Sequence, residues 1–443
     1  MRILVCNTFG RLLGGIESYL DRVIPALAQS RHEVAMLFEK DSPAAYPRLP
    51  IPDRAWFVSE LGVAQTLREL RQWRPDIIYT HAMSDARLEQ AVIETAPAVH
   101  FAHDYAATCI SGAKTFAFPH TRRCSRRFGA QCLINYFPRR CGGISPITMW
   151  QNYRGNRHRL EVMRGYRRVL VASEAMQREY LQHGFRPSRV KLVPYPVTPM
   201  AADVAGDDNG ASTICLSEAR QGARSDAVHL LFAGRMVRLK GGAILLQALP
   251  HSTRTLHRPL KLSLVGDGPA KAEWEAQARV LCARNPSITV EFTGWLGYAD
   301  LRELIAACDL LVIPSLWPEP FGMIGPEAGI GGLPAAAFAV GGIPEWLHDG
   351  VNGFLAPANP ASAAGLATAI AKCLADPLLH RQLRQGAQRE AMKFSLTRHV
   401  ARMVAIFARV VAEATAPERS DAEPNSSGGT KYSRTNKSAS CAY

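Results

Sequence analysis

Two glutamates eight positions apart mark the stretch of this chain best suited to chemistry. Glu319 follows an apolar strand candidate through a turn rich in Pro and Gly, and Glu327 falls within the helix expected after that turn. An ionised carboxylate accepts several hydrogen bonds and donates none, so sugar and ribose hydroxyls suit it as partners. The end of a strand, a loop and the start of a helix form a common ligand crevice in open α/β sheets. The stretch 315–332 therefore predicts a pocket for a sugar nucleotide.

Two cations flanked by glycines lie in a second candidate binding loop, A-G-R-M-V-R-L-K-G-G. Arg235 and Lys240 follow the first apolar strand candidate of the second half of the chain. At the carboxyl end of a strand, the fork of an arginine and the point charge of a lysine suit a pyrophosphate. The alternative is a surface loop with ordinary basic residues, and this motif alone does not distinguish that loop from a pyrophosphate site.

Three shorter motifs fit the same kind of pocket. Gly14 and Gly15 separate the first strand from the first helix, where glycine permits close approach of a ligand and the helix N-terminus favours an anion. His103 ends an apolar strand; a neutral imidazole there binds a hydroxyl or acts as a base, although a lone histidine is more often structural. The motif V-G-D-G-P, which contains Gly266, predicts a strand and a tight turn that shape the cleft wall. Each motif is weak when taken alone.

Short apolar runs alternate with helical stretches along most of the chain. Such runs are typical of buried parallel strands, and their alternation with helices indicates βαβ units. The strand candidates are Ile3–Cys6, Glu33–Phe38, Asp76–Thr80, Ala98–Ala102, Val169–Ala172, Lys191–Tyr195, His229–Ala233, Lys261–Val265, Ile288–Phe292, Leu310–Ile313 and Pro334–Phe338. The helix candidates are Glu17–Ser30, Leu61–Trp73, Glu174–His183, Gly242–Leu249, Ala270–Arg284, Tyr298–Ala307 and Leu396–Ala414. The pattern predicts an α/β protein with two domains around a cleft.

Composition suggests where the domains divide. We expect a first domain at residues 1–197 with an insertion at 105–165, and a second domain at 228–395 followed by a helix at 396–414. Residues 198–227 are rich in small and polar residues and predict a linker, and residues 415–443 predict a disordered tail. No apolar run is long enough to span a bilayer, and the start does not resemble a signal peptide, so we expect a cytoplasmic protein.

Positive charge is concentrated between Arg122 and Arg168. The chain has a net charge of +14, and this segment holds 12 arginines, no lysine and one acid, Glu161. A field of one sign attracts polyanions or an anionic membrane surface. Aromatic side chains between the arginines favour such a partner, and a merely solvated surface is the alternative. No motif typical of groove recognition is present, so we expect no nucleic acid.

Four cysteines lie in or beside this basic segment. Cys109, Cys124, Cys132 and Cys141 fall within 33 residues of turn-rich sequence. Four thiolates can close a structural zinc site. The C-x-x-C pairs usual in such sites are missing, so free buried cysteines are the competing interpretation. A protein purified without chelator that contains no metal would contradict the zinc site.

The order of the motifs is more specific than any one of them. The chain contains, in sequence, G-G-I-E-S, H-D-Y, G-R-x4-K-G, V-G-D-G-P, F-T-G-W-L, P-E-P-F-G-M-I-G-P-E-A and V-G-G-I-P-E-W-L-H-D-G-V-N-G-F-L. Through these motifs, residues 1–414 resemble the retaining GT-B glycosyltransferases of glycosyltransferase family 4. The resemblance implies two Rossmann-like domains that face each other across a cleft. The first would bind the acceptor and the second the nucleotide-sugar donor.

The resemblance also implies a role for each candidate residue. Glu327 would hold the ribose hydroxyls and Glu319 the transferred sugar, while Arg235 and Lys240 would stabilise the departing pyrophosphate in place of Mg²⁺. His103 would contact the sugar near the reacting carbon, and no metal is needed for catalysis. The implied catalytic residues are thus His103, Arg235, Lys240 and Glu319. The implied donor-binding residues are Gly14, Gly15, Gly234, Gly266, Leu296, Phe321, Gly322, Met323, Ile324 and Glu327.

The predicted function is transfer of a sugar from a nucleotide-diphosphate sugar to a glycan or lipid-linked acceptor, in synthesis of a cell-surface polysaccharide or lipopolysaccharide. Attachment to the inner face of the cytoplasmic membrane is the expected location. The resemblance implies retention by front-face attack. The chain departs from the family at A-G-I-G-G-L-P-A-A-A-F after Glu327, which affects packing more than chemistry. A non-catalytic sugar-nucleotide-binding protein of the same fold is the alternative; an epimerase would lack this order of motifs.

Overall fold

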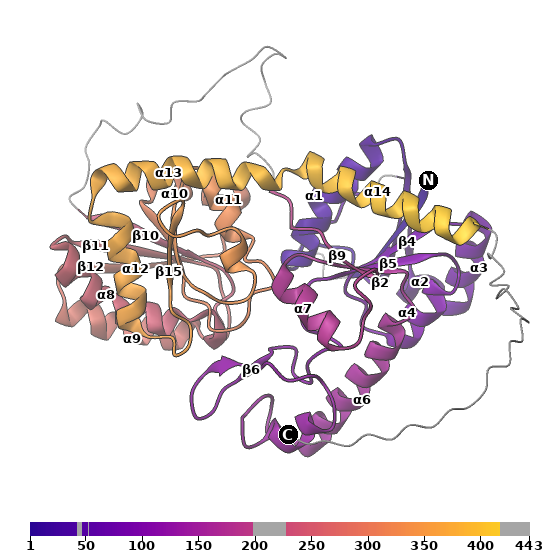
Figure 1. Ribbon diagram of the computed structural model, residues 1–443, viewed down its shortest axis with the longest axis horizontal. Coiled ribbons are helices and arrows are strands. Elements are labelled where there is room, and N and C mark those ends of the chain that lie inside the picture. Colours follow the sequence, from indigo (N-terminus) through magenta and orange to yellow (C-terminus); the bar gives the residue numbers. More distant parts are fainter. Residues whose placement is uncertain (42–46, 52, 198–226, 417–443) are drawn as a thin grey trace, which may run out of the picture.

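The protein consists of two parallel β-sheets, each surrounded by helices (Figure 1). The computed structural model describes residues 1–41, 47–51, 53–197 and 227–416. The predicted linker lies outside the described residues except for Ala227, and the predicted tail does so except for its first two residues. This architecture confirms the predicted pair of Rossmann-like domains.

The first sheet has the strand order β3-β2-β1-β4-β5-β8-β9, with all pairs parallel. Its strands are β1 (Arg2–Phe9), β2 (Glu33–Lys40), β3 (Arg54–Phe57), β4 (Ile77–Thr80), β5 (Ala98–Ala102), β8 (Arg168–Val171) and β9 (Val190–Leu192). Its helices are α1 (Gly15–Gln29), α2 (Val58–Leu61), α3 (Val63–Trp73), α4 (Ala86–Ile93) and α7 (Glu174–Gln182). Alternate residues of β1 enter different cores, because successive side chains of a strand point to opposite faces of the sheet.

An insertion between β5 and β8 carries little sheet structure of its own. It contains β6 (Thr115–Phe116), β7 (Arg122–Arg123), α5 (Gln131–Tyr136) and α6 (Pro146–Met163). The two short strands pair antiparallel, and the later part of α6 packs against α4. In Figure 1 the insertion lies along the lower edge of the molecule, below the sheets.

The second sheet has the order β12-β11-β10-β13-β14-β15, also parallel throughout. Its strands are β10 (Val228–Ala233), β11 (Leu260–Val265), β12 (Ile288–Gly294), β13 (Leu310–Ile313), β14 (Ala335–Phe338) and β15 (Gly353–Ala356). Its helices are η1 (Arg238–Lys240), α8 (Gly242–Leu256), α9 (Lys271–Arg284), α10 (Tyr298–Ala307), α11 (Ile324–Ile330), η2 (Ile343–Glu345), α12 (Ala363–Leu374), α13 (Pro377–Ala391) and η3 (Met392–Phe394).

The last helix, α14 (Leu396–Thr415), returns to the first domain and packs against α1 and β4 (Figure 1). His399 on this helix bonds the Pro194 carbonyl at 2.8 Å through Nδ1 and the Tyr19 hydroxyl at 2.8 Å through Nε2. A single apolar cluster joins the facing sides of both domains and includes Phe321 and Phe407. The domains are therefore held by a shared core, and the Val197 amide also donates to the Phe394 carbonyl at 2.7 Å. No helix in the described part of the chain is both long and apolar enough to cross a bilayer.

Candidate active site

The site lies where the strand order of each sheet reverses. In the second sheet β10 has β11 on one side and β13 on the other, and in the first sheet β1 has β2 and β4. Helices that follow two such strands leave on opposite faces of the sheet, which opens a crevice at their carboxyl ends. The loops after β10 and β13 carry the predicted cations and carboxylates, so the topology brings residues 234–240 and 314–327 together.

Lys240 and Glu319 form an ion pair between the loops that follow β10 and β13. Lys240 Nζ lies 2.6 Å from Glu319 Oε1, and Ser315 donates its hydroxyl to the same carboxylate. The Glu319 side chain is 6% exposed, whereas that of Lys240 is 27% exposed. The ammonium also lies 5.4 Å from the centre of the Trp317 ring. Glu319 thus positions a partly open cation, whose remaining N–H groups can meet an anionic ligand.

The turn after β10 is built from glycines in close contact. Gly266 has φ +124°, and a Cβ added to it would lie 2.2 Å from the Gly234 carbonyl oxygen. A Cβ on Gly241 would lie 1.8 Å from the Pro314 carbonyl oxygen. Side chains are therefore excluded from both positions. The turn leaves Arg235 exposed at the end of β10, with no hydrogen bond or ion pair to any described residue through its guanidinium.

Glu327 lies on α11 and contacts the other domain. Its Oε1 accepts from Arg22 Nη1 of α1 at 2.5 Å, and this guanidinium also lies 5.4 Å from the centre of the Tyr298 ring. The Glu327 and Arg22 side chains are 16% and 15% exposed. The pair leaves the second carboxylate oxygen for a ligand and fixes the direction of Glu327. Arg22 was not predicted as a site residue, because nothing in the pattern of α1 indicates a partner 305 positions away.

The segment between the two glutamates forms the wall of the crevice. Phe321 is buried between the rings of Tyr195 and Phe394, and its carbonyl accepts from Trp346 Nε1 at 2.7 Å. Gly322, Met323 and Ile324 form the turn that opens α11, with Gly322 at φ +84°. The predicted donor residue Leu296 lies half-buried after β12 and packs against the shared core.

Gly14 and Gly15 lie at the N-terminus of α1 in the first domain. Gly14 is the N-cap residue and provides no side-chain cap, and a Cβ added to Gly15 would meet no atom within 4 Å. The first N–H groups of a helix lack partners within the helix, and the helix dipole favours an anion there. Open space above Gly15 therefore fits close approach by a phosphate.

His103 uses both ring nitrogens inside the protein. Its Nε2 lies 2.7 Å from His81 Nδ1, and its Nδ1 lies 2.6 Å from the Tyr195 hydroxyl. Burial, followed by nearby histidines, lowers the pKa of both His81 and His103 well below the usual range, so both are neutral at pH 7. The tautomers of the two rings are linked, because each shared contact needs one donor and one acceptor.

A polar pocket beside His103 was not predicted from the sequence. His81, His103, Glu89, Asp104 and Arg159 are among the residues that line it. His81 Nε2 and Glu89 Oε2 are buried there without a hydrogen-bond partner among the described residues. An unpaired buried polar atom is costly, so both atoms suit a ligand or water that bonds them. His81 follows β4 as His103 follows β5, and this shared position was the signal available in the sequence.

Because several histidines are buried in the neutral form, we expect the folded protein to become less stable as the pH decreases. Burial lowers the pKa of His399 to about 4 and that of His100 to about 3. It also lowers the pKa values of His81 and His103 well below the usual range for histidine. The unfolded chain binds a proton at each site near pH 6.5, whereas the folded chain does not. Each therefore removes up to about 1.4 kcal/mol of stability per pH unit below that point. We expect the melting temperature to decrease between pH 7 and pH 5.

His399→Gln provides the comparison for this pH dependence, because it removes one titrating group and keeps a hydrogen-bonding side chain. Its melting temperature should depend less steeply on pH than that of the wild type. Burial raises the pKa values of Glu89 and Glu179, so these two groups stabilise the folded protein at lower pH. They oppose the effect of the histidines only where they become protonated. A wild-type melting temperature that stays constant from pH 7 to pH 5 would contradict the prediction.

The four cysteines of the insertion do not form a metal site as they stand. Across residues 1–41, 47–51, 53–197 and 227–416, no three His, Cys, Asp or Glu side chains are arranged to hold a metal ion. Cys109 Sγ accepts from the Lys114 amide at 3.3 Å, and Cys141 Sγ lies 3.6 Å from the Asn135 carbonyl. Burial, followed by the other thiols, raises the pKa of Cys141 to about 12. Cys109 and Cys141 are thus bonded to the backbone around them, and structural zinc stays a prediction.

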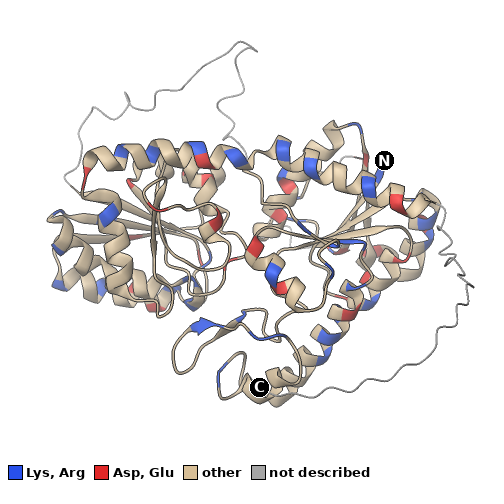
Figure 2. Ribbon diagram, in the orientation of Figure 1, with Lys and Arg blue, Asp and Glu red and all other residues tan. Residues whose placement is uncertain are grey.

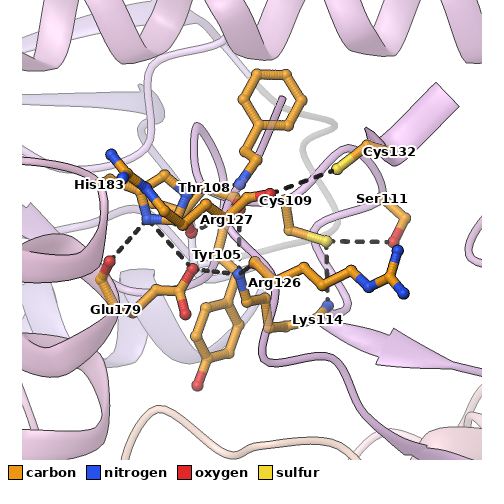
Figure 3. Close-up of polar contacts among 11 residues, drawn as sticks. Tyr105, Thr108, Cys109, Ser111, Lys114, Arg126, Arg127, Cys132, Glu179 and His183 are labelled. Carbon is orange, nitrogen blue, oxygen red and sulfur yellow. Dashed lines mark hydrogen bonds and ion pairs between the residues drawn. The ribbon is translucent and has the colours of Figure 1, made fainter. Parts of the chain in front are cut away.

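A buried ion pair instead attaches the insertion to the first domain (Figure 3). Lys114 is fully buried, pairs with Glu179 of α7, and donates to the Arg126 carbonyl at 2.6 Å. His183, also on α7, accepts from the Phe128 amide at 2.8 Å. The insertion is therefore fixed by charged and neutral hydrogen bonds that could not be predicted from the sequence.

Two family models together match most of the chain. "Glycosyl transferases group 1" matches residues 217–390, and "Glycosyltransferase Family 4" matches residues 13–199. D-inositol 3-phosphate glycosyltransferase 1 of Catenulispora acidiphila is 31% identical over 245 residues, which cover 54% of this chain and 56% of that protein. Glycogen synthase of Mycobacterium tuberculosis is 31% identical over 201 residues, 44% of this chain and 46% of that protein. The chain thus matches about half the length of these relatives.

Solved structures show the same fold over nearly the whole chain. Anabaena HepE in complex with UDP superposes with a TM-score of 0.65 at 22% identity, covering 92% of this chain and 100% of that one. WaaG, a glycosyltransferase involved in lipopolysaccharide biosynthesis, has a TM-score of 0.62 at 19% identity, covering 91% and 99%. With the two family models on its two domains and this fold, the chain belongs to the GT-B glycosyltransferases of group 1 and family 4.

Proposed function

We propose that the protein is a retaining glycosyltransferase that moves a sugar from a nucleotide-diphosphate sugar to a glycan or lipid-linked acceptor. The observation that carries the proposal is that Glu319 lies in the loop before α11 and Glu327 in the first turn of α11, each paired with a cation. Lys240 holds Glu319 and Arg22 holds Glu327. Such a loop can accept hydrogen bonds from both sugars of a donor, while Lys240 and Arg235 meet the charge between them.

The cations supply the main catalytic effect in this proposal. The bond from the anomeric carbon to the phosphate oxygen breaks, and negative charge grows on the departing diphosphate. Lys240, already oriented by Glu319, stabilises this charge without needing to reorganise, and exposed Arg235 offers a second set of donors. The role usually taken by a divalent metal ion is thereby filled by side chains.

Retention follows from attack on the same face that the diphosphate leaves. The acceptor oxygen bonds the anomeric carbon, and its proton passes to the departing phosphate oxygen. Lys240 and Ser315 both bond Oε1 of Glu319, and in this proposal the carboxylate positions Lys240 and does not act as a nucleophile. The pocket beside His103, with the unpaired atoms of His81 and Glu89, is suited to hydroxyl groups of the acceptor.

Relatives support a role in glycan assembly. HepE has been crystallised with UDP and with UDP-glucose, and WaaG is named for lipopolysaccharide biosynthesis. We infer a sugar nucleotide as donor and the synthesis of a cell-surface polysaccharide or lipopolysaccharide as the setting. The alternative is a protein of the same fold that binds a sugar nucleotide without transferring it.

A donor screen tests the proposal. Purified protein is mixed with UDP-, GDP- and ADP-sugars, and thermal shift and nucleotide release are followed together. One donor should raise the melting temperature, since a ligand of the folded state stabilises it, and should be hydrolysed slowly. Glu327→Gln should weaken the shift for that donor. Binding without release, even with crude membrane lipids added, would favour the non-catalytic alternative, and no binding at all would contradict both.

A further inference from the structure

The insertion exposes an unusual set of apolar side chains. Exposed fractions reach 95% for Ile144, 74% for Ile134 and 71% for Ile147. We name as the α5–α6 tip the exposed apolar residues of α5, the following loop and the start of α6: Ile134, Phe137, Ile144, Ile147 and Trp150. Burying large apolar side chains is the main drive of folding, so a cluster left in water indicates a surface with another partner.

The first turns of α6 show how this tip is organised. Ile147, Trp150, Arg154 and Arg157 follow one another at spacings of three and four, so they form one stripe along the helix. All four are exposed, and the stripe is apolar at the start of α6 and cationic further along. α5 packs against α6, which places Ile134 on the neighbouring helix. The surface is therefore apolar at its end and positively charged along its side.

Arginines dominate the rest of the insertion. Residues 105–165 contain ten arginines, one lysine and a single acid, Glu161. The lysine is Lys114, which is buried and paired with Glu179, so the exposed charge comes from arginine. Arg140 lies 5.1 Å from the centre of the exposed Phe118 ring. Figure 2 shows the positive residues along α6 and the β6–β7 region, with few negative ones nearby.

The exposure is imposed by the fold. Tyr136 and Phe116 are buried within the insertion, and the Tyr136 hydroxyl accepts from the Gly143 amide at 3.0 Å in the loop that presents Ile144. Lys114 and His183 fix the base of the insertion to α7. The apolar tip consequently stays outside the core of the domain, in a defined position.

We propose that the α5–α6 tip docks on an anionic lipid bilayer, with its apolar side chains in the interfacial region and the arginines on lipid phosphates. Aromatic residues such as Trp150 favour the membrane interface, and each arginine close to an anionic surface strengthens binding about fivefold. A soluble polyanion would use the arginines but would leave Ile144 and Ile147 in water. The bilayer is the partner that satisfies both parts of the surface.

Docking there would bring the cleft near the membrane. Tyr105 begins the insertion, and its ring lies 6.2 Å from that of Trp317 in the loop that carries Glu319. The insertion that carries the α5–α6 tip therefore contacts the loop of Glu319, and a lipid-linked acceptor in the bilayer would lie near this site. The binding of vesicles itself is independent of the proposed transfer reaction, so either can fail without the other.

Co-sedimentation with vesicles tests the proposal. The full chain should bind vesicles that contain phosphatidylglycerol and bind vesicles of phosphatidylcholine much more weakly. Ile144→Ser/Ile147→Ser/Trp150→Ser should weaken binding to the anionic vesicles at least about tenfold, and Arg154→Gln/Arg157→Gln should weaken it about tenfold or more. The matched control is Val280→Ser/Leu378→Ser/Met392→Ser, which removes three exposed apolar side chains from the second domain and should bind as the wild type does.

Melting temperatures and the thermal shift with sugar nucleotides verify that every variant is folded. Binding that decreases with salt and with both sets of substitutions in the insertion supports the proposal. No binding to anionic vesicles at low salt would overturn it. Equal loss of binding in the insertion variant and its control, or binding to heparin in solution with none to vesicles, would also overturn it.

Discussion

Replacing Lys240 with alanine is expected to lower kcat by about 10²–10³-fold, the effect of removing one pre-organised charge that stabilises a transition state. Lys240 is held 2.6 Å from Glu319 and faces the crevice with part of its surface open. The substitution also leaves the buried Glu319 carboxylate with only Ser315 among its described side-chain partners. We therefore expect kcat to fall more than KM rises, because the growing charge of the leaving group is present only in the transition state. Steady-state kinetics with the donor found in the screen measures this.

Lys240→Arg and Arg238→Ala provide the controls. Arginine keeps the charge at position 240 but does not fit the geometry of a single-point contact, so an intermediate loss of rate is expected. Arg238 lies in the same turn but pairs with Glu273 at the surface, and its loss should leave kcat within a few-fold of the wild type. Turnover of Lys240→Ala close to that of the wild type would contradict the assigned role.

The sequence predicted every central strand of the two sheets but only half of their edge strands, namely β9 and β12. Each predicted strand coincides with a strand of the two sheets, because central parallel strands are buried on both faces and are apolar throughout. The two missed sheet strands, β3 and β15, are the outer strands on one side of each sheet. An outer strand has fewer neighbours, so its sequence need not be continuously apolar.

Two helices show why helix prediction was less complete. α6 was missed because its outer surface carries the exposed apolar and cationic residues of the tip, which removes the usual amphipathic pattern. α8 was expected to end at Leu249 and instead continues through Pro250 to Leu256. The hydroxyls of Ser252 and Thr253 donate to carbonyls four residues earlier, and these bonds hold the turn after the proline.

The candidate site was predictable as far as it depends on strand ends. Glu319, Lys240 and His103 each follow a strand, and parallel strands bring their carboxyl ends to one edge of a sheet. Partners that depend on packing between distant segments were not predictable. Arg22 meets Glu327 only because α1 faces α11 across the cleft, and no periodicity in either helix encodes that contact.

Replacing Lys114 with methionine is expected to destabilise the protein by about 3–5 kcal/mol, because it leaves Glu179 as an unpaired buried carboxylate. Burial raises the pKa of Glu179 even beside Lys114, and losing the lysine raises that pKa further. When the pKa of a carboxyl is higher in the folded than in the unfolded state, low pH favours the folded protein. The stability lost in Lys114→Met should therefore be smaller at pH 5 than at pH 8. Denaturant unfolding at both pH values measures it.

The double variant Lys114→Met/Glu179→Leu separates the charge from the packing. Replacing both members of a buried pair with apolar residues is often neutral, so most of the lost stability should return. Lys271→Met is the surface control; Lys271 pairs with the exposed Asp267 at 3.8 Å and should change stability by less than about 1 kcal/mol. Since Lys114 also donates to the Arg126 carbonyl, trypsin should cleave the single variant near Arg126 faster than the wild type. Unchanged stability in Lys114→Met would mean that the insertion does not depend on this pair.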